Sequence, residues 1–229
     1  MRIAKCVDIG ARGPQPATRS IGQERWHVVG YSWGSAIALE YAAIHPDRVA
    51  STVLGGTFIS TPHWILGTNL LIRDLAPEVQ RDILACEGKN RPPAETCKAA
   101  EKVFSAAYNG RPDAPPRSPE AQAYRKRTQG KGFNEKLYNA MWGPSEFSAL
   151  GSLVGYDATP LLAKLDGKRT LFLVGQYDEA RLDTVRDYAR LTAGAELAVV
   201  PGGSHSFGAE RTVETEGLLR GWLARKDAK

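Results

Sequence analysis

A serine between two glycines is the first candidate for chemistry in this sequence, within HVVGYSWGSAIALEYA from His27 to Ala42. A serine hydroxyl is a weak nucleophile at neutral pH, so it needs a nearby base that is itself held by a third group. The pattern G-x-S-x-G is typical of a sharp turn from strand to helix, where Gly30 and Gly34 leave room for an exposed Ser32. The amide of Trp33, at the start of the helix, can donate to an oxyanion. The pattern is short and also occurs around inert serines, so partners elsewhere in the chain decide its meaning.

An acid and a base follow later apolar runs of the strand type. Asp178 lies in VGQYDEAR after TLFLV, and His205 lies in PGGSHSFG after LAVV. The carboxyl ends of parallel strands meet at one edge of a sheet, where open α/β sheets bind their ligands. The order serine, aspartate, histidine is that of α/β-hydrolases. We therefore predict that Ser32 attacks the substrate, His205 carries the proton and Asp178 orients His205.

The elements that must hold these residues alternate between strand and helix at both ends of the chain. Apolar runs predict strands over 26–29, 49–54, 170–174 and 197–200. Helical periodicity predicts helices over 33–45, 182–191 and 213–225. This rhythm predicts parallel strands joined by right-handed crossovers. Residues from about 59 to 150 contain two helical stretches (75–87 and 93–109) and a proline-rich connection but no clear strand, which indicates a helical insertion.

Composition and charge narrow the class of protein. The chain has 229 residues, 42% of them hydrophobic and 24% charged, as in ordinary globular proteins. The net charge of +5 is scattered, and the densest basic run, 125–127 with Lys131 nearby, favours a solvated helix face over a nucleic-acid groove. No apolar run is long enough to span a bilayer, and the first residues lack the apolar core of a secretory signal. We expect a soluble, cytoplasmic protein that binds neither nucleic acid nor membranes.

The cysteines do not indicate a metal site. Cys6, Cys86 and Cys97 are an odd number without metal-ligand spacing. Cys86 and Cys97 would pair in an oxidising compartment, but reduced thiols are the favoured interpretation. No metal or organic cofactor is expected.

Three longer strings resemble one family. GYSWGSAIALEYAAIHPDRV, YNAMWGPSEF and LVGQYDEA together resemble the proline iminopeptidase (prolyl aminopeptidase) family of α/β-hydrolases, from about Trp26 to the C-terminus. The resemblance implies a mostly parallel sheet flanked by helices, with a helical cap inserted over the nucleophile. It divides the chain into 1–58, the N-terminal part of the hydrolase core with the nucleophile turn, 59–150, the cap, and 151–229, the C-terminal part of the core.

The resemblance also implies an activity and further site residues. Such enzymes release an N-terminal residue, often proline, from short peptides through an acyl-enzyme, and acidic residues bind the free amine. By motif these residues are Glu146 of GPSEF and Glu179 of YDE, with Tyr138 lining the same pocket. An ammonium ion that leaves water needs such a carboxylate partner. The alternatives are that Glu146 caps or bridges within the insertion, that Glu179 is solvated at a helix start, and that Tyr138 is a core residue.

The sequence departs from that family at its beginning. It has no HGGPG-type loop, which supplies the second oxyanion donor in the family, and Ser32 follows the first clear strand. We therefore expect an N-terminally incomplete hydrolase core whose first strand offers an unpaired edge, which favours association with another chain, as in an oligomer. With Trp33 as the remaining oxyanion donor, turnover would fall by about 10²–10³-fold. Alternatives to an aminopeptidase are an esterase or amidase on the same scaffold and a truncated, weakly active or non-catalytic remnant.

Overall fold

The structure is a computed structural model that describes residues 24–117, 119–128 and 134–227. The stretch IAKCVDIGARG, interpreted from sequence as a remnant strand and turn, lies outside the described residues, and so does Cys6. Lys131 of the basic run also lies outside them.

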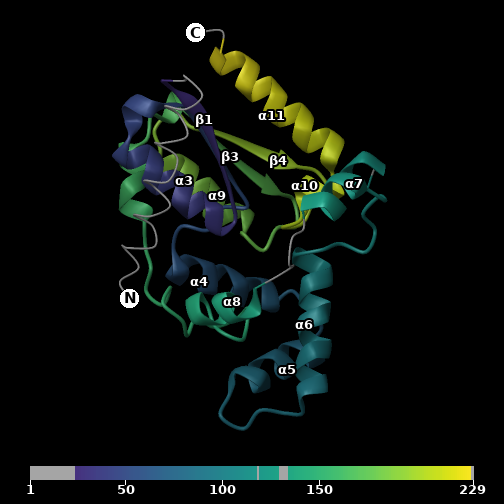
Figure 1. Cartoon of the computed structure of the whole chain (residues 1–229). Helices are drawn as coiled ribbons and strands as arrows, with labels where there is room; N and C mark the ends of the chain where they lie inside the picture. The colour runs from purple at the N-terminus through teal and green to yellow at the C-terminus, as the bar shows by residue number, and fades with distance from the viewer. Residues whose placement is uncertain (1–23, 118, 129–133, 228–229) are drawn as a thin grey trace.

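Strands and helices alternate at both ends of the described chain, and helices fill the middle (Figure 1). The first part holds β1 (Trp26–Tyr31), α3 (Trp33–Ile44), a 3₁₀ turn (Pro46–Arg48) and β2 (Val49–Gly55). The middle holds α4 (Thr61–Ile72), α5 (Pro77–Glu87), α6 (Ala94–Tyr108), α7 (Pro119–Thr128) and α8 (Glu135–Met141). The last part holds 3₁₀ turns (Thr159–Lys164 and Gly167–Arg169), β3 (Thr170–Gly175), α9 (Leu182–Leu191), β4 (Glu196–Val200), α10 (Phe207–Glu210) and α11 (Thr212–Asp227).

The four strands form one parallel sheet in the order β1-β2-β3-β4. The predicted parallel arrangement is therefore confirmed, and every predicted strand is present. β1 runs two residues further than predicted, to Tyr31, because Gly30 and Tyr31 pair with Leu54 and Gly55 of β2. All four carboxyl ends consequently meet at one edge of the sheet, which is where the turns after the strands can converge.

Alternating strand residues build a core on each face of the sheet. Leu54 and Phe172 pack with side chains of α3 and α9 on one face. Leu171 and Leu173 pack with Trp222 of α11 on the other face. Phe172 and Trp222 are fully buried, and each such side chain contributes about 1.5–3 kcal/mol or more by leaving water. This three-layer packing holds the strand ends, and the residues that follow them, in fixed positions.

The helical segment, which we define as α4–α8 (residues 61–141), lies beside the carboxyl edge of the sheet, and α5 and α6 extend away from it (Figure 1). Ile72, Ile83 and Phe104 of this segment form an apolar cluster with Phe147 from the chain that follows it. The two helices predicted in this region correspond to α5 and α6, whereas α4 was not predicted. Pro62 at the start of α4, where proline is tolerated, and Gly67 within it hide its helical pattern.

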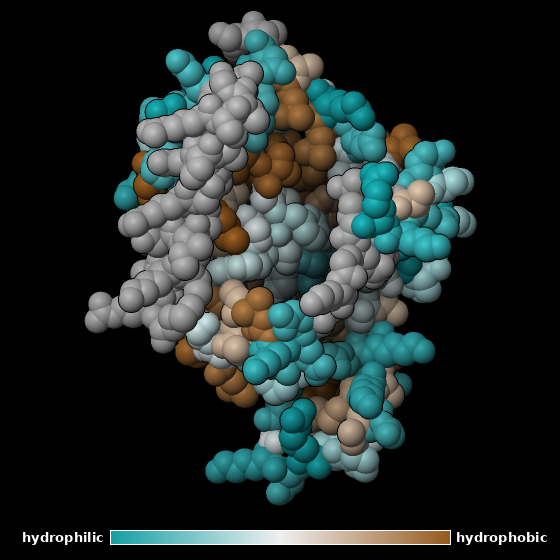
Figure 2. Space-filling view, in the orientation of Figure 1, coloured by the Kyte–Doolittle hydropathy of each residue, from teal (hydrophilic) through white to brown (hydrophobic). Residues whose placement is uncertain are grey.

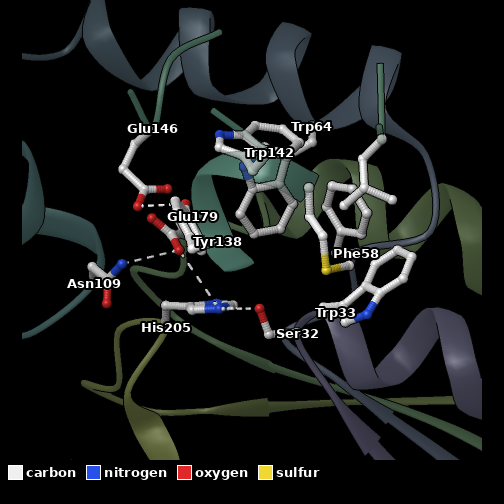
Figure 3. Close-up of a pocket in the computed structure, with 12 residues that line it drawn as sticks. Ser32, Trp33, Phe58, Trp64, Asn109, Tyr138, Trp142, Glu146, Glu179 and His205 are labelled. Carbon is white, nitrogen blue, oxygen red and sulfur yellow. Dashed lines mark hydrogen bonds and ion pairs between the residues drawn. The ribbon is translucent and has the colours of Figure 1, made fainter. Parts of the chain in front are cut away.

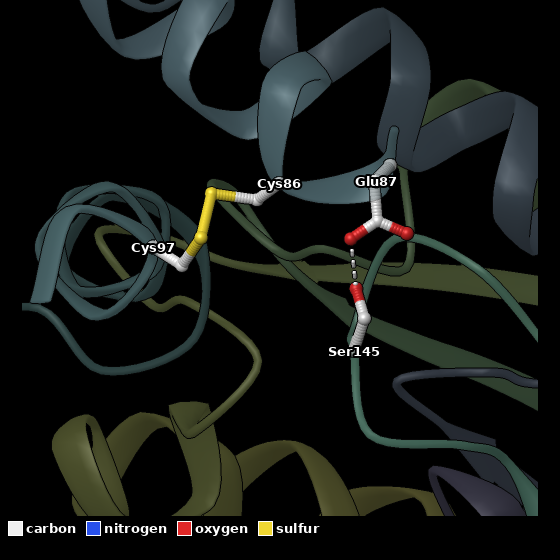
Figure 4. The surroundings of a disulfide bond; sticks show 4 residues. All are labelled: Cys86, Glu87, Cys97 and Ser145. Atoms are coloured by element: carbon white, nitrogen blue, oxygen red, sulfur yellow. Dashed lines mark hydrogen bonds between the residues drawn. A yellow bond between two sulfur atoms is a disulfide. The ribbon is translucent and has the colours of Figure 1, made fainter. Parts of the chain in front are cut away.

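Cys86 and Cys97 form a disulfide that joins the end of α5 to the start of α6 (Figure 4). The preference for reduced thiols at these two positions is therefore wrong. The short connection between the two helices brings the cysteine Cα atoms within 5.7 Å, a separation that a disulfide spans. Nearby, Ser145 donates to the carboxylate of Glu87 over 2.6 Å, so the tip of the segment is tied to the chain that follows α8.

β1 is an edge strand within the described part of the chain. Val29 is 56% exposed and Tyr31 43% exposed, and they line a hollow of about 450 Å³ with Ile37 and Ala38 of α3. Apolar side chains gather on this face in Figure 2. Of the helices that the structure describes, none is long and apolar enough to cross a membrane.

Candidate active site

Ser32 occupies a strained turn between β1 and α3. Its φ of 52° and ψ of −128° make it the one non-glycine residue with positive φ among the described residues. Such a conformation costs about 1–3 kcal/mol and is typical of functional sites. The turn is held by the Ser32 amide, which donates to the Gly55 carbonyl of β2 over 2.9 Å. The serine side chain therefore lies at the carboxyl edge of the sheet.

The two flanking glycines have different roles. A Cβ atom on Gly30 would lie 2.2 Å from the Gly34 carbonyl oxygen and 2.6 Å from the Ala38 Cβ, so a side chain there is excluded. A Cβ on Gly34 would meet no described atom within 4 Å. The expectation that both glycines relieve crowding is therefore right for Gly30 and wrong for Gly34, because the side-chain direction at Gly34 points away from the turn.

The structure brings Ser32, His205 and Asp178 together, although they lie far apart in sequence (Figure 3 shows the first two). His205 Nε2 lies 2.9 Å from Ser32 Oγ, and His205 Nδ1 lies 2.7 Å from Asp178 Oδ1. Asp178 also accepts the backbone N–H groups of Gly175 and Ala180. These bonds fix the carboxylate, which in turn fixes the imidazole with Nε2 toward the serine.

Trp33 is the first residue of α3, directly after Ser32. The first four N–H groups of a helix have no partner within the helix, and the helix dipole adds a partial positive charge there. The Trp33 amide is therefore placed to donate to an oxygen that becomes negative beside Ser32 Oγ.

A cavity of about 270 Å³ opens above Ser32 and His205. Most of its wall is apolar, formed by Trp33, Phe58, Trp64, Met141, Trp142 and Leu153. Phe58 is in ring contact with Trp33, Trp64 and Trp142, so the aromatic wall is one packed unit. Trp64 also meets the ring of His205 edge-on at 5.6 Å. A group bound here would contact mainly apolar and aromatic side chains.

Two carboxylates and their hydrogen-bond donors form the polar part of the cavity (Figure 3). Asn109 Nδ2 donates to Glu179 Oε1 over 3.0 Å, and Tyr138 OH donates to Glu146 Oε1 over 2.7 Å. Burial, reinforced by the neighbouring Glu146 charge, raises the pKa of Tyr138, so its hydroxyl stays protonated and remains a donor. The side chains predicted from sequence at 138, 146 and 179 therefore face the same space as the serine.

Burial and neighbouring charges shift the pKa values of two groups in the cavity. Burial raises the pKa of Glu179 to about 7, although the His205 charge opposes this shift. Burial lowers the pKa of His205, but the Asp178 charge and hydrogen bond, with the charges of Glu179 and Glu146, outweigh burial and raise it to about 9. Both values follow from placing carboxylates and an imidazole together away from water.

The end of α6 is bonded directly to the turns that carry the acid and the base. The Tyr108 carbonyl accepts the backbone N–H groups of both Glu179 and His205, over 3.2 and 2.8 Å. The Asn109 carbonyl accepts the Ser206 N–H over 3.1 Å. The helical segment therefore helps to position the two turns that carry Asp178, Glu179 and His205.

Sequence reasoning missed Asn109 and most of the aromatic wall. Asn109 lies 70 residues from Glu179, and nothing in its local sequence marks it as a partner. Trp142 is part of the MWGPSEF string, but the string by itself does not say that the indole lines a cavity. In the part of the chain that the structure describes, no group of three or more His, Cys, Asp or Glu residues could hold a metal ion.

The chain belongs to the alpha/beta hydrolase fold family, whose sequence model matches residues 17–212. It is similar to the proline iminopeptidase of Heyndrickxia coagulans, at 29% identity over 187 residues that cover 82% of this chain and 62% of that protein. It is also similar to the proline iminopeptidase of Lactobacillus delbrueckii subsp. lactis, at 29% identity over 90% of this chain and 68% of that protein.

A solved proline iminopeptidase from Mycobacterium smegmatis has a TM-score of 0.82 to this chain, at 21% identity, over 97% of this chain and 72% of that one. At this identity the likeness shows the fold. The predicted α/β-hydrolase fold, with its mostly parallel sheet flanked by helices, is thus confirmed, and so is the resemblance to proline iminopeptidases.

Proposed function

We propose that this chain carries the catalytic site of a serine hydrolase of aminopeptidase type, which releases an N-terminal residue, with proline favoured, from short peptides. The observation that carries the proposal is one cavity that contains both a serine–histidine–aspartate arrangement and two carboxylates, Glu146 and Glu179. A simple ester hydrolase has no need of the carboxylates. An enzyme for substrates with a free amine does need them, since a cation that leaves water requires a negative partner.

The chemistry follows from the distances in the site. His205 Nε2 takes the proton of Ser32 Oγ as the oxygen bonds to the substrate carbonyl carbon, and Asp178 stabilises the resulting imidazolium. The Trp33 N–H stabilises the oxyanion. The C–N bond then breaks, and His205 gives its proton to the leaving amine. Water, deprotonated by His205, attacks the acyl-enzyme, the bond to Ser32 breaks, and the proton returns to Oγ.

The position of the carboxylates supports cleavage after the first residue. Glu179 Oε1 lies 3.5 Å from His205 Nε2, so an ammonium group bound by Glu179 lies close to the carbonyl that Ser32 attacks. An amine one atom away from the carbonyl carbon, as in an N-terminal residue, fits this spacing. The aromatic wall around Phe58 and Trp142 suits a compact apolar ring such as that of proline, and the relatives named proline iminopeptidase agree with this choice.

Hydrolysis of a panel of aminoacyl anilides, each with a free and an N-acetylated amine, tests the proposal. The wild type should cleave free prolyl anilide and leave the acetylated form nearly intact, and Ser32→Ala should cleave neither. Equal rates on free and acetylated substrates would contradict recognition of the amine. Equal rates for wild type and Ser32→Ala would show that the activity belongs to a contaminant.

The apolar wall favours a second candidate, an esterase or amidase for apolar acyl groups. It predicts rapid turnover of N-blocked esters and no response to Glu146→Gln, so the same panel separates the two activities. A non-catalytic remnant predicts that a fluorophosphonate probe leaves Ser32 unlabelled in the folded protein.

A further inference from the structure

His205 Nε2 faces two groups at once. Ser32 Oγ lies 2.9 Å away and Glu179 Oε1 lies 3.5 Å away (Figure 3). The other ring nitrogen, Nδ1, is committed to Asp178. The two groups make opposite demands on Nε2. Ser32 can give up its proton only if Nε2 is unprotonated, whereas the negative charge of Glu179 favours a proton on Nε2.

The charges around His205 all favour the protonated ring. Asp178 and Glu179 come from the turn after β3, and Glu146 comes from the chain after α8. The rings of Tyr31, from β1, and Trp64, from α4, also contact the His205 ring and bring no charge. His205 and Glu179 are 7% and 6% exposed, so water screens their attraction weakly. These charges raise the pKa of His205 to about 9, which favours a proton on both nitrogens at neutral pH and opposes proton transfer from Ser32.

We propose that the ammonium group of the substrate switches on the general base: by binding Glu179, it neutralises the carboxylate that holds the proton on His205 Nε2. The Nε2–H bond then breaks, its proton passes to solvent, and the freed lone pair accepts the hydrogen bond of Ser32 Oγ. One positive charge enters and one proton leaves, so the net charge of the cavity stays the same. This inference rests on the proposed function and gives Glu179 a second role in it.

The two carboxylates then have separable roles. Glu146 is held by Tyr138 and belongs to the amine site. Glu179 belongs to that site too, but of the two it is the one within ion-pair distance of His205. A blocked N-terminus would be rejected twice, since it neither binds the carboxylates nor frees the base.

The rate at which a neutral fluorophosphonate probe labels Ser32 tests the inference, because the probe has no amine. We expect the probe to label Ser32 faster in Glu179→Gln than in the wild type at pH 7, by about tenfold for each unit by which the pKa of His205 falls. The acid limb of the plot of labelling rate against pH should move to lower pH. The Gln amide oxygen can still accept from Asn109, so the buried hydrogen bond is kept. Glu146→Gln is the matched control. It also removes one carboxylate from the cavity, but Glu146 is not the carboxylate within ion-pair distance of His205, so the acid limb should move to lower pH by less than in Glu179→Gln.

The possible outcomes separate the two proposals. Identical labelling profiles for Glu179→Gln and wild type would overturn the switch and leave the aminopeptidase proposal standing. Absence of Ser32 labelling in the wild type at every pH would overturn both. Faster labelling of Glu146→Gln than of Glu179→Gln would also overturn the assignment to Glu179.

A measurement on the unmodified enzyme avoids any effect of the substitution on folding. Pyrrolidine is a cation at pH 8 and has no bond to cleave. Its binding, followed by titration calorimetry in buffers of different ionisation enthalpy, should release up to about one proton per site, because pH 8 lies between the pKa values of Glu179 and His205. Binding without proton release would contradict the switch, and absence of binding would contradict amine recognition as well.

Discussion

The two glycines around Ser32 should respond oppositely to alanine. In Gly30→Ala the new Cβ would lie 2.2 Å from the Gly34 carbonyl oxygen, about 0.8 Å inside the closest approach that Cβ atoms make. The neighbouring atoms are backbone and a packed alanine, so relief requires movement of the turn itself. Overpacking of this kind costs about 1–3 kcal/mol. At about 2–4 °C for each kcal/mol in a chain of this size, the melting temperature should fall by about 2–12 °C.

Gly34→Ala is the matched control, since it makes the same change four residues away within the same motif. Its Cβ meets no described atom within 4 Å, and alanine in a helix is favoured over glycine by up to about 1 kcal/mol. The melting temperature should therefore stay the same or rise by up to about 4 °C. Scanning calorimetry gives both values, and fluorophosphonate labelling reports whether Ser32 keeps its position. A Gly30→Ala protein as stable as wild type, or equal losses in both variants, would refute this steric reasoning.

Three further outcomes follow from the described contacts. Replacing Cys86 and Cys97 by serine should lower the free energy of unfolding by up to about 3 kcal/mol, seen in denaturant melts, because the bridge closes a loop with a sequence separation of 11; a reductant should destabilise the wild type and leave the double variant unchanged. Asp178→Asn should slow labelling of Ser32 by about 10⁴-fold through loss of the orienting carboxylate, and a drop of less than tenfold would refute that role. Asn109→Ala removes the hydrogen bond from Asn109 to the Glu179 carboxylate, and a hydrogen bond to a charged group contributes about 1.5–3 kcal/mol. KM for free-amine substrates should therefore rise at least tenfold, while turnover of blocked esters is unchanged.

The sheet and the meeting of Ser32, Asp178 and His205 could be predicted because each depends on local sequence. Each of these residues lies in the turn after a recognisable strand, and the carboxyl ends of parallel strands lie at one edge of the sheet. No long-range contact had to be guessed, because the parallel order of the strands is enough to bring the three turns together. The catalytic roles of these residues, and the boundaries of the cap, remain predictions.

Features that depend on how helices pack could not be predicted in the same way. The pairing of Cys86 with Cys97 requires the end of α5 to lie beside the start of α6, which a spacing of 11 residues does not specify. Asn109 meets Glu179 because α6 ends beside the turn after β3, a contact between elements 70 residues apart. The two glycines of the motif look equivalent in sequence and differ in the direction of the absent side chain.

The backbone bonds from Tyr108 to the turns that carry Asp178 and His205 also limit how this chain could be re-engineered. Adding one residue to α6 would advance its last turn by about 1.5 Å and rotate it by about 100°, which withdraws the shared carbonyl from both N–H groups. A chimera that grafts in the helices of another hydrolase must therefore reproduce the length of α6 and not merely its ends. Loop insertions at the far tip, between α5 and α6, leave that register intact, and this is where the fold can accommodate variation in length.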